Sequence, residues 1–308
     1  MRIVSLLPSS TEIVAALGRT SDLVGRSHEC DFPNEVKTLP VLTEPKFAVA
    51  GGSQAIDQSV RNLVEQGLSV YQLNAPLLNE LAPDVVLTQS QCEVCAVNFH
   101  EVEAAVKQVV TSEPTVVDLK PVGYEDLFAD ITRVGAALDR VNEAEELIKQ
   151  MQNRVAAVRD KVASLTERPS VACIEWLSPL MSAANWMPDL VEQAGGVNLF
   201  GQSGEHSTEL KWADIQAADP DLIVIMPCGY GIAQSRNEMK LLTQQPGWQD
   251  LKAVKANKVF LVDGNQYFNR PGPRIADSVE ILAELLHPTL FAATYAPNGW
   301  MQYREIYI

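Results

Sequence analysis

The sequence predicts an α/β protein with two lobes joined by one long helix, and three observations support this. Short apolar runs alternate with helical patterns over residues 3–118. A charged stretch rich in helix formers, residues 142–165, follows this alternation. The alternation of apolar runs and helical patterns then begins again at Val171. Because strands that alternate with helices form parallel sheets with crossover connections, each half is expected to hold its own sheet.

The first half is expected to form an N-terminal α/β lobe over residues 1–122. A helix should follow the first strand, since Ser9-Ser10-Thr11-Glu12 places Ser9 and Glu12 at the spacing of a capping box. The expected strands of this lobe are residues 3–7, 23–26, 70–73, 85–88 and 115–118, and its further helices are residues 54–65, 77–81 and 99–109.

Residues 123–168 are expected to be a helical segment. It holds one helix over residues 125–138, a break near Asp139 and a second helix over residues 142–165. A helix of about 24 residues extends about 36 Å, which is long enough to join two lobes.

The C-terminal α/β lobe is expected over residues 169–288, followed by a C-terminal tail over residues 289–308. Its expected strands are residues 171–176, 222–225 and 259–262, and its expected helices are residues 188–194, 237–243 and 275–286.

Composition narrows the function classes. The chain has 308 residues, enough for two domains, and a formal net charge of −15. An acidic protein is a poor partner for nucleic acid, because phosphate binding requires clustered Lys and Arg. No apolar stretch is long enough to span a bilayer, so membrane insertion is not expected.

The N-terminus predicts a cytoplasmic protein. The first apolar run starts at Ile3 and is typical of a buried strand, which leaves no room for a signal peptide. A reducing compartment keeps thiols free, which agrees with an odd number of cysteines, five.

Four residues with soft metal-ligand chemistry follow two of the expected strands. His28 and Cys30 follow residues 23–26, and Cys92 and Cys95 follow residues 84–87. The carboxyl ends of parallel strands share one edge of a sheet, so these side chains are expected to cluster there. Three thiolates and one imidazole can bind zinc or another soft metal ion. Alternatives are a redox pair of Cys92 and Cys95, structural thiols, and a histidine paired with the backbone.

The second lobe predicts a wall for a flat ligand. Aromatic and thioether side chains near strand ends suit a broad, flat ligand, although they could equally form a core between the lobes. The candidates that follow or end the three expected strands are Glu175, Trp176, Trp186, Met187, Cys228, Tyr267, Phe268 and Arg270.

Motifs of catalysis are missing from the sequence. It contains no phosphate loop, dinucleotide glycine fingerprint, Gly-x-Ser-x-Gly elbow or His-Glu-x-x-His helix. We therefore expect no catalytic residues and favour binding over catalysis.

Five segments together resemble the substrate-binding proteins of vitamin B12 and ferric-siderophore ABC importers. Their order along the chain, with the long helix between them, also resembles that family. The segments are Ile3-Val4-Ser5-Leu6-Leu7-Pro8-Ser9-Ser10-Thr11-Glu12, Leu23-Val24-Gly25-Arg26-Ser27, Leu81-Ala82-Pro83-Asp84-Val85-Val86-Leu87, Gln193-Ala194-Gly195-Gly196-Val197-Asn198-Leu199-Phe200 and Ala218-Asp219-Pro220-Asp221-Leu222-Ile223-Val224.

The resemblance implies two Rossmann-like lobes on a rigid helical hinge, a ligand held between them and no catalysis. It is closest to the B12-binding branch. The leading hypothesis is a non-catalytic binding protein for a corrinoid such as cobalamin, or for another small-molecule metal chelate. Its protein partner would be an ABC importer or a cytosolic acceptor protein. The alternatives are a metal- or redox-dependent enzyme that uses the Cys/His cluster, and a zinc-binding scaffold.

Overall fold

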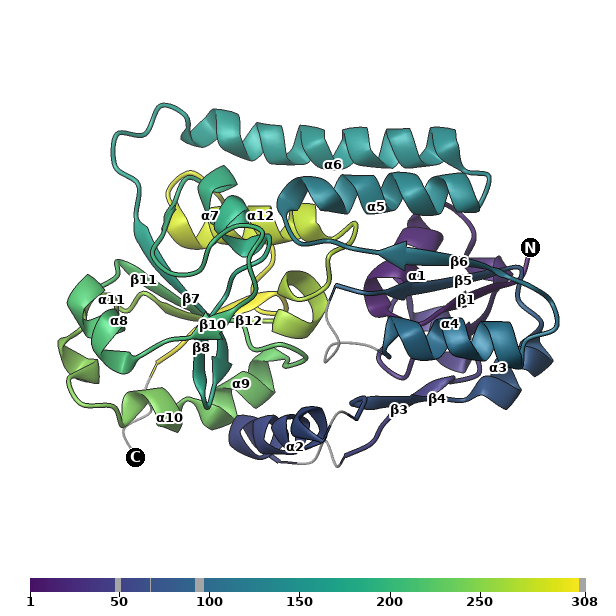
Figure 1. Ribbon diagram of the computed structural model, residues 1–308. Helices are drawn as coiled ribbons and strands as arrows, with labels where there is room; N and C mark the ends of the chain where they lie inside the picture. The colour runs from purple at the N-terminus through teal and green to yellow at the C-terminus, as the bar shows by residue number, and fades with distance from the viewer. Residues whose placement is uncertain (48–50, 67, 92–96, 305–308) are drawn as a thin grey trace. The chain divides into compact units, whose positions relative to one another are not determined.

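The computed structural model describes residues 1–47, 51–66, 68–91 and 97–304. The chain divides into two compact units. The N-terminal unit comprises residues 1–51, 55–121 and 125–150, and the C-terminal unit comprises residues 52–54, 122–124 and 151–308. The division falls within one long helix, α6 (Val141–Val162), which confirms the single joining helix. Figure 1 shows the order of the elements along the chain.

The N-terminal unit is built on a four-stranded parallel sheet. Its order is β2-β1-β5-β6, from β1 (Ile3–Ser5), β2 (Leu23–Arg26), β5 (Val85–Gln89) and β6 (Thr115–Leu119). The strand predicted at residues 70–73 is β4 (Tyr71–Leu73), but it lies outside this sheet and pairs antiparallel with β3 (Thr43–Pro45), which the sequence did not predict. The helices are α1 (Pro8–Ala16), α2 (Ser53–Glu65), α3 (Ala75–Leu81), α4 (Phe99–Gln108) and α5 (Tyr124–Ala137), with short 3-10 turns at Thr20–Asp22 and Asn34–Thr38.

Apolar residues of the two central strands hold this sheet to its helices. Val4 and Val86 pack in one cluster with Leu78 of α3 and Val102 of α4, and all four are fully buried. Gly25 in β2 permits this close packing, because a Cβ there would lie 2.4 Å from the Cδ1 atom of Leu42. Burial of these apolar side chains stabilises the packing of the sheet against α3 and α4.

Helix α1 begins differently from the sequence prediction, and the capping box is wrong. The helix starts at Pro8, and its N-cap residue, Leu7, offers no side-chain hydrogen bond. Proline suits this first position because its missing N–H would lack a helical partner there anyway. The hydroxyl of Ser10 instead donates to the carbonyl oxygen of Leu7 at 3.0 Å, and the Oγ1 atom of Thr11 lies 3.2 Å from the same oxygen.

The C-terminal unit holds a mixed seven-stranded sheet. Its order is β10-β8-β7-β11-β12-β13, and β9 also pairs with β7. The strands β7, β9, β11 and β12 run parallel. The strands β8, β10 and β13 each join the sheet through an antiparallel pairing, so the expectation of a purely parallel sheet is wrong. The strands are β7 (Ser170–Leu177), β8 (Leu180–Ser182), β9 (Val197–Asn198), β10 (Thr208–Glu209), β11 (Leu222–Ile225), β12 (Val259–Val262) and β13 (Trp300–Gln302).

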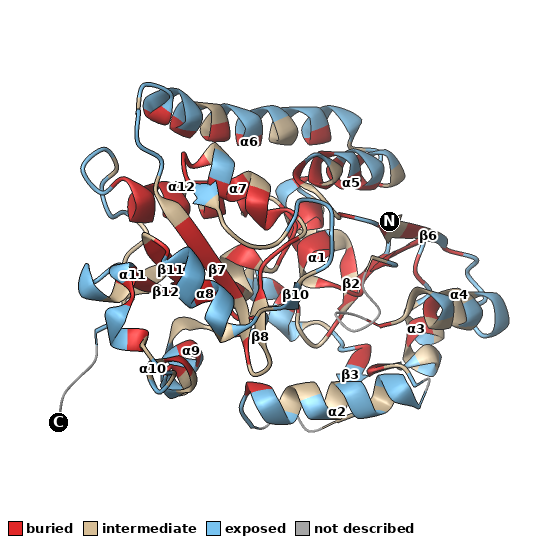
Figure 2. Ribbon diagram, turned by 60° about the vertical axis from the view of Figure 1, so that its left-hand side comes forward, coloured by how far each residue is buried: buried red, intermediate tan, exposed pale blue. Residues whose placement is uncertain are grey.

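Helices surround this second sheet, and its central strands are buried, as Figure 2 shows for β7 and β11. Ile174 and Ile225 pack against Ile215 of α8 and Leu242 of α10. The helices are α7 (Met187–Gln193), α8 (Trp212–Ala218), α9 (Ile232–Glu238), α10 (Lys240–Thr243), α11 (Lys252–Lys255) and α12 (Ile275–Leu286), with a 3-10 turn at Trp248–Asp250 and a π-type turn, η4, at Gly264–Phe268.

The residues after α12 add a strand where the sequence predicted a tail. Strand β13 pairs with β12 in antiparallel register. The carboxylate of Glu284, which is buried, accepts hydrogen bonds from the Nε1 atom of Trp300 at 2.6 Å and the amide of Thr294 at 2.7 Å. These bonds fasten the C-terminal segment to α12.

Over the described residues, no helix combines the length and the apolar character needed to cross a membrane.

Candidate functional site

An aromatic pair lies at the carboxyl ends of two neighbouring strands of the C-terminal unit. Trp176 is near the end of β7, and Tyr230 follows β11, its parallel neighbour. The two rings lie 5.3 Å apart between centroids and are inclined by 59°. Tyr230 is buried and Trp176 half-buried. Burial, and then the charge of Glu238, raise the pKa of Tyr230 to about 12, so the pair stays uncharged at neutral pH.

An acid and a thiol lie next to this pair. The carboxylate of Glu175 accepts a hydrogen bond from the hydroxyl of Ser207 at 2.6 Å, and burial raises the pKa of Glu175. Cys228 is exposed, and its amide donates to the carbonyl oxygen of Glu175 at 3.2 Å. The edge therefore offers an aromatic surface flanked by a polarisable sulfur and a carboxyl group, a combination that suits an apolar ligand with polar substituents.

The turn η4 brings the end of β12 onto the end of β11. A Cβ at Gly264 would lie 2.4 Å from the carbonyl oxygen of Pro227, so only glycine permits this approach. The amide of Asn265 donates to the carbonyl oxygen of Tyr230 at 3.1 Å. Tyr267 on the same turn is half-buried, and its ring contacts the ring of Tyr295. Tyr267 thus belongs to the same edge as Tyr230.

Four of the predicted ligand residues are buried within the C-terminal unit. The Nε1 atom of Trp186 donates to the carbonyl oxygen of Phe268 at 3.1 Å, and Met187 follows Trp186 at the start of α7. The guanidinium of Arg270 donates to the Oδ1 atom of Asn265 at 2.9 Å. Direct ligand contact by these residues stays a prediction. Their observed contacts are with other residues of the C-terminal unit, and these contacts stabilise the aromatic edge. The buried four are Trp186, Met187, Phe268 and Arg270.

His28 lies two residues beyond the end of β2 in the N-terminal unit and is held by its neighbours. Its Nδ1 atom lies 2.8 Å from the hydroxyl of Thr43, and its ring contacts the ring of Tyr71 at 5.3 Å. Burial, and then the charge of Arg26, lower the pKa of His28. The imidazole is therefore neutral at pH 7, the form that can donate a lone pair to a metal.

Cys30 takes part in a different set of contacts from His28. Its Sγ atom is buried and lies 3.1 Å from the Oγ1 atom of Thr11. The same hydroxyl donates to the Oγ atom of Ser5 at 2.7 Å, and the Oγ atoms of Ser5 and Ser10 lie 2.6 Å apart. We call Ser5, Ser10, Thr11 and Cys30 the hydroxyl–thiol cluster. Its members satisfy one another's polar groups.

The predicted zinc site has no support in the part of the chain that the structure describes. Cys92 and Cys95 lie outside the described residues. Among the described ones, no three His, Cys, Asp or Glu side chains come close enough to share a metal ion.

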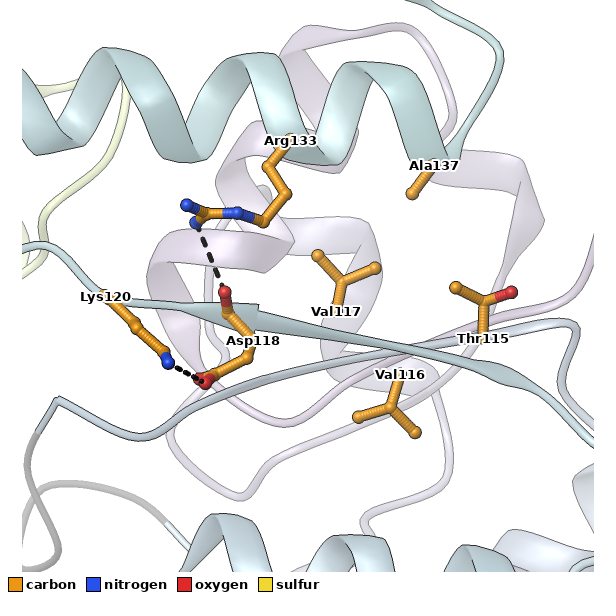
Figure 3. A pocket seen from close by; sticks show the side chains of 7 residues that line it. All are labelled: Thr115, Val116, Val117, Asp118, Lys120, Arg133 and Ala137. Carbon is orange, nitrogen blue, oxygen red and sulfur yellow. Dashed lines mark hydrogen bonds and ion pairs between the residues drawn. The ribbon is translucent and has the colours of Figure 1, made fainter.

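A shallow hollow of the N-terminal unit lies between β6 and α5 (Figure 3). Its charged groups are already paired. The Nζ atom of Lys120 lies 3.1 Å from the Oδ2 atom of Asp118, and Arg133 donates to the carbonyl oxygen of Asp118 at 3.2 Å. The side chain of Arg133 also pairs with Asp130. With these charges paired, the hollow is a weaker candidate for a ligand than the aromatic edge.

Sequence reasoning missed Tyr230, Ser207 and Tyr295 as members or supports of the edge. Tyr230 could have been found, because it follows a strand directly after Cys228 and Gly229. Ser207 and Tyr295 come from loops far along the chain, 32 and 28 residues from the contacts at Glu175 and Tyr267. No short-range sequence pattern predicts contacts between residues so far apart in the chain.

The chain belongs to the periplasmic binding protein family. The family model matches residues 3–265, which cover both strand–helix alternations and the joining helix. The family assignment confirms the resemblance and the interpretation as a binding protein, not an enzyme. The fold is that of the helical-hinge members, as predicted.

Three similar proteins illustrate the family. An uncharacterised ABC transporter substrate-binding lipoprotein of Bacillus subtilis is 24% identical over 94% of this chain and 81% of its own. The vitamin B12-binding protein of Photorhabdus laumondii is 20% identical over 93% of this chain and 88% of its own. The crystal structure of a periplasmic heme-binding protein from Pseudomonas aeruginosa covers 99% of both chains, with a TM-score of 0.73 and 22% identity.

The predicted cytoplasmic location is wrong. The similar proteins include a lipoprotein of an ABC transporter and periplasmic binding proteins, which face the outside of the cytoplasmic membrane. The prediction depended on the few residues before Ile3, and these do not decide where a protein works. Because the location is wrong, a cytosolic acceptor protein is no longer expected as a partner. Proteins of this family work with ABC importers.

Proposed function

We propose that this protein is the binding component of an ABC importer for a metal tetrapyrrole, with a corrinoid such as cobalamin as the first choice. The aromatic pair of Trp176 and Tyr230 carries the proposal. A corrin or porphyrin is broad, flat and largely apolar, and an uncharged aromatic surface binds such a face by contact and by release of water.

The chemistry beside the pair supports the same class of ligand. Glu175 has a raised pKa and Cys228 is exposed, so the edge offers both a hydrogen-bonding carboxyl group and a soft sulfur. The amide substituents of a corrinoid can donate hydrogen bonds to a carboxyl group. The resemblance to the B12-binding branch supports a corrinoid as the first choice over heme.

Heme is the second candidate, and His28 is the observation that favours it. A neutral imidazole is a common ligand of heme iron. If the Nδ1 atom of His28 donates to the Thr43 hydroxyl, the Nε2 atom keeps its lone pair for a metal in the ligand. Cobalt in a corrinoid can take the same donor, so His28 is compatible with both ligands.

An absorbance titration tests the proposal. Purified protein is titrated with hydroxocobalamin and, separately, with hemin, and ATP serves as a flat ligand without a metal. We expect saturable spectral shifts with hydroxocobalamin at one ligand per chain, weaker binding of hemin and none of ATP. Binding of ATP alone, or of none of the three, would show the proposal to be wrong.

Replacement of His28 by Gln sharpens this test. Loss of a donor to the metal should change the visible spectrum of the bound complex, because the bands of the cofactor report its axial ligand. A spectrum identical to that of the wild-type complex would show that His28 does not bind the metal of the ligand, and it would leave the rest of the proposal standing.

A further inference from the structure

A polar cluster ties the joining helix to the C-terminal segment within the C-terminal unit. Arg154 on α6 donates through Nε and Nη2 to the two carboxylate oxygens of Glu280, at 3.0 and 2.7 Å. Its Nη2 atom also lies 2.5 Å from the Oδ1 atom of Asp277 and 3.1 Å from the phenol oxygen of Tyr295. Such a two-pronged pair between Arg and a carboxylate fixes geometry as well as charge.

The phenol of Tyr295 is held inside this cluster. Its oxygen lies 2.8 Å from the Oδ1 atom of Asp277 and 2.6 Å from the Oε2 atom of Glu280. Burial and these two carboxylates raise the pKa of Tyr295, so its proton stays in place at any physiological pH. Three charged groups therefore fix the position of one aromatic ring.

The ring of Tyr295 contacts the candidate site. It meets the ring of Tyr267 edge to face, with centroids 6.0 Å apart and planes inclined by 81°. The guanidinium carbon of Arg274 lies 5.4 Å from the centroid of the Tyr267 ring. Both contacts are of kinds that favour one orientation of an aromatic ring over others.

The turn η4, which carries Tyr267, is hydrogen-bonded to the backbone of the aromatic pair. The carbonyl oxygen of Tyr267 accepts a hydrogen bond from the hydroxyl of Ser278, and the amide of Asn265 donates to Tyr230 at 3.1 Å. A shift of η4 would therefore displace the backbone of Tyr230, whose ring contacts Trp176. The series of contacts runs without a break from Arg154 to the aromatic pair.

We propose that Arg154 and Tyr295 are positioning residues, which orient Tyr267 and the turn η4 against the ligand. This inference rests on the proposed function, since it assigns the supports of the same edge. Neither residue needs to touch the ligand. The cluster acts through the ring of Tyr267, so it should set the affinity of the site for a flat ligand.

A double-mutant cycle between Tyr295 and Tyr267 tests this inference. The variants are Tyr295→Leu, Tyr267→Ala and the double variant, each titrated with hydroxocobalamin and hemin. We expect Tyr295→Leu alone to raise the Kd roughly three- to tenfold, the range expected when one aromatic contact is lost. In the Tyr267→Ala background the same change should leave the Kd unaltered, because the ring that it positions is gone.

Tyr295→Phe and Trp300→Phe provide the controls. Tyr295→Phe keeps the ring contact with Tyr267 but loses the bonds to the carboxylates, so it should raise the Kd by less than Tyr295→Leu. Trp300→Phe removes a hydrogen bond of the same C-terminal segment, to Glu284, without touching Tyr267. It should lower the thermal midpoint and leave the Kd unchanged.

Additive effects of Tyr295→Leu and Tyr267→Ala on the Kd would overturn the inference and leave the proposed function intact. An unchanged Kd for Tyr295→Leu would overturn it equally. If the wild-type protein binds neither hydroxocobalamin nor hemin, the proposed function fails, and the inference fails with it.

Discussion

The carboxyl edges of the two sheets have opposite chemistry. At the N-terminal edge, small hydroxyl groups and a thiol bond to one another in the hydroxyl–thiol cluster and are fully buried. At the C-terminal edge, Trp176 is half-buried and packs on the buried ring of Tyr230, and Cys228 is exposed. Polar groups that satisfy each other stabilise a fold, whereas apolar surface that stays accessible is available to a ligand. The comparison assigns stability to the hydroxyl–thiol cluster and ligand contact to the aromatic edge of the C-terminal unit.

The largest effect is expected from a buried residue behind the C-terminal edge. Trp186→Ala should destabilise the protein by about 3–5 kcal/mol, because it leaves a cavity and an unpaired carbonyl at Phe268. Trp176→Ala, at a half-exposed position, should cost less than about 2 kcal/mol. Urea denaturation of both variants measures the difference. Equal losses of stability would mean that Trp176 is a core residue. That result would contradict the assignment of ligand contact to the C-terminal edge.

The stability of the folded N-terminal unit should depend on pH through the carboxyl group of Asp130. Burial raises the pKa of Asp130 from 3.8 to about 6, although Lys120 and Arg133 oppose this. The folded protein thus holds the proton more tightly than the unfolded chain. The contribution of this bound proton to the free energy of unfolding is fully present below pH 3.8 and is lost as the pH rises through about 6. The loss should amount to about 2–3 kcal/mol.

Asp130→Asn should remove that dependence. Denaturation midpoints of the variant and the wild type, compared at intervals from pH 4 to pH 8, should lie closest near pH 4, separate as the pH rises to about 6 and stay a constant distance apart above that. Parallel curves over the whole range would show that Asp130 keeps an ordinary pKa in the folded protein.

The hydroxyl–thiol cluster should matter for stability alone. Thr11→Val removes a buried hydroxyl that donates to Ser5 at 2.7 Å and approaches Cys30 at 3.1 Å, so it should cost about 1–3 kcal/mol. Thr132→Val is the matched control, since its hydroxyl bonds only one turn back to Phe128 and the residue is exposed. A change of ligand affinity in Thr11→Val without loss of stability would reverse the assignment of the two edges.

Much of the fold could be predicted from the sequence, because apolar runs and helix formers act locally. Strands at residues 23–26, 222–225 and 259–262 and the helix at residues 275–286 were predicted with the bounds that the structure shows. The joining helix was predicted to within a few residues. The antiparallel strands β8, β10 and β13 were not predicted, since they are two or three residues long and owe their conformation to pairing with distant strands.

The candidate site was harder to predict than the fold. The end of β7 was found because Trp176 follows an apolar run, but Trp186 and Phe268 look the same in sequence and are buried. Whether an aromatic ring faces the solvent or the core depends on tertiary packing, which sequence spacing near a turn does not determine. The ring of Tyr267 is likewise held by Tyr295, 28 residues further along the chain.

Calorimetric titration of Trp176→Ala with hydroxocobalamin, beside the wild type and Thr11→Val, tests the central claim most directly. The wild type and Thr11→Val should bind with the same Kd, of about 1 µM or below. Trp176→Ala should bind about 10- to 100-fold more weakly, the loss expected for an aromatic contact residue. Equal affinity in all three proteins, or an affinity lost only in Thr11→Val, would contradict the claim that the aromatic edge of the C-terminal unit holds the ligand.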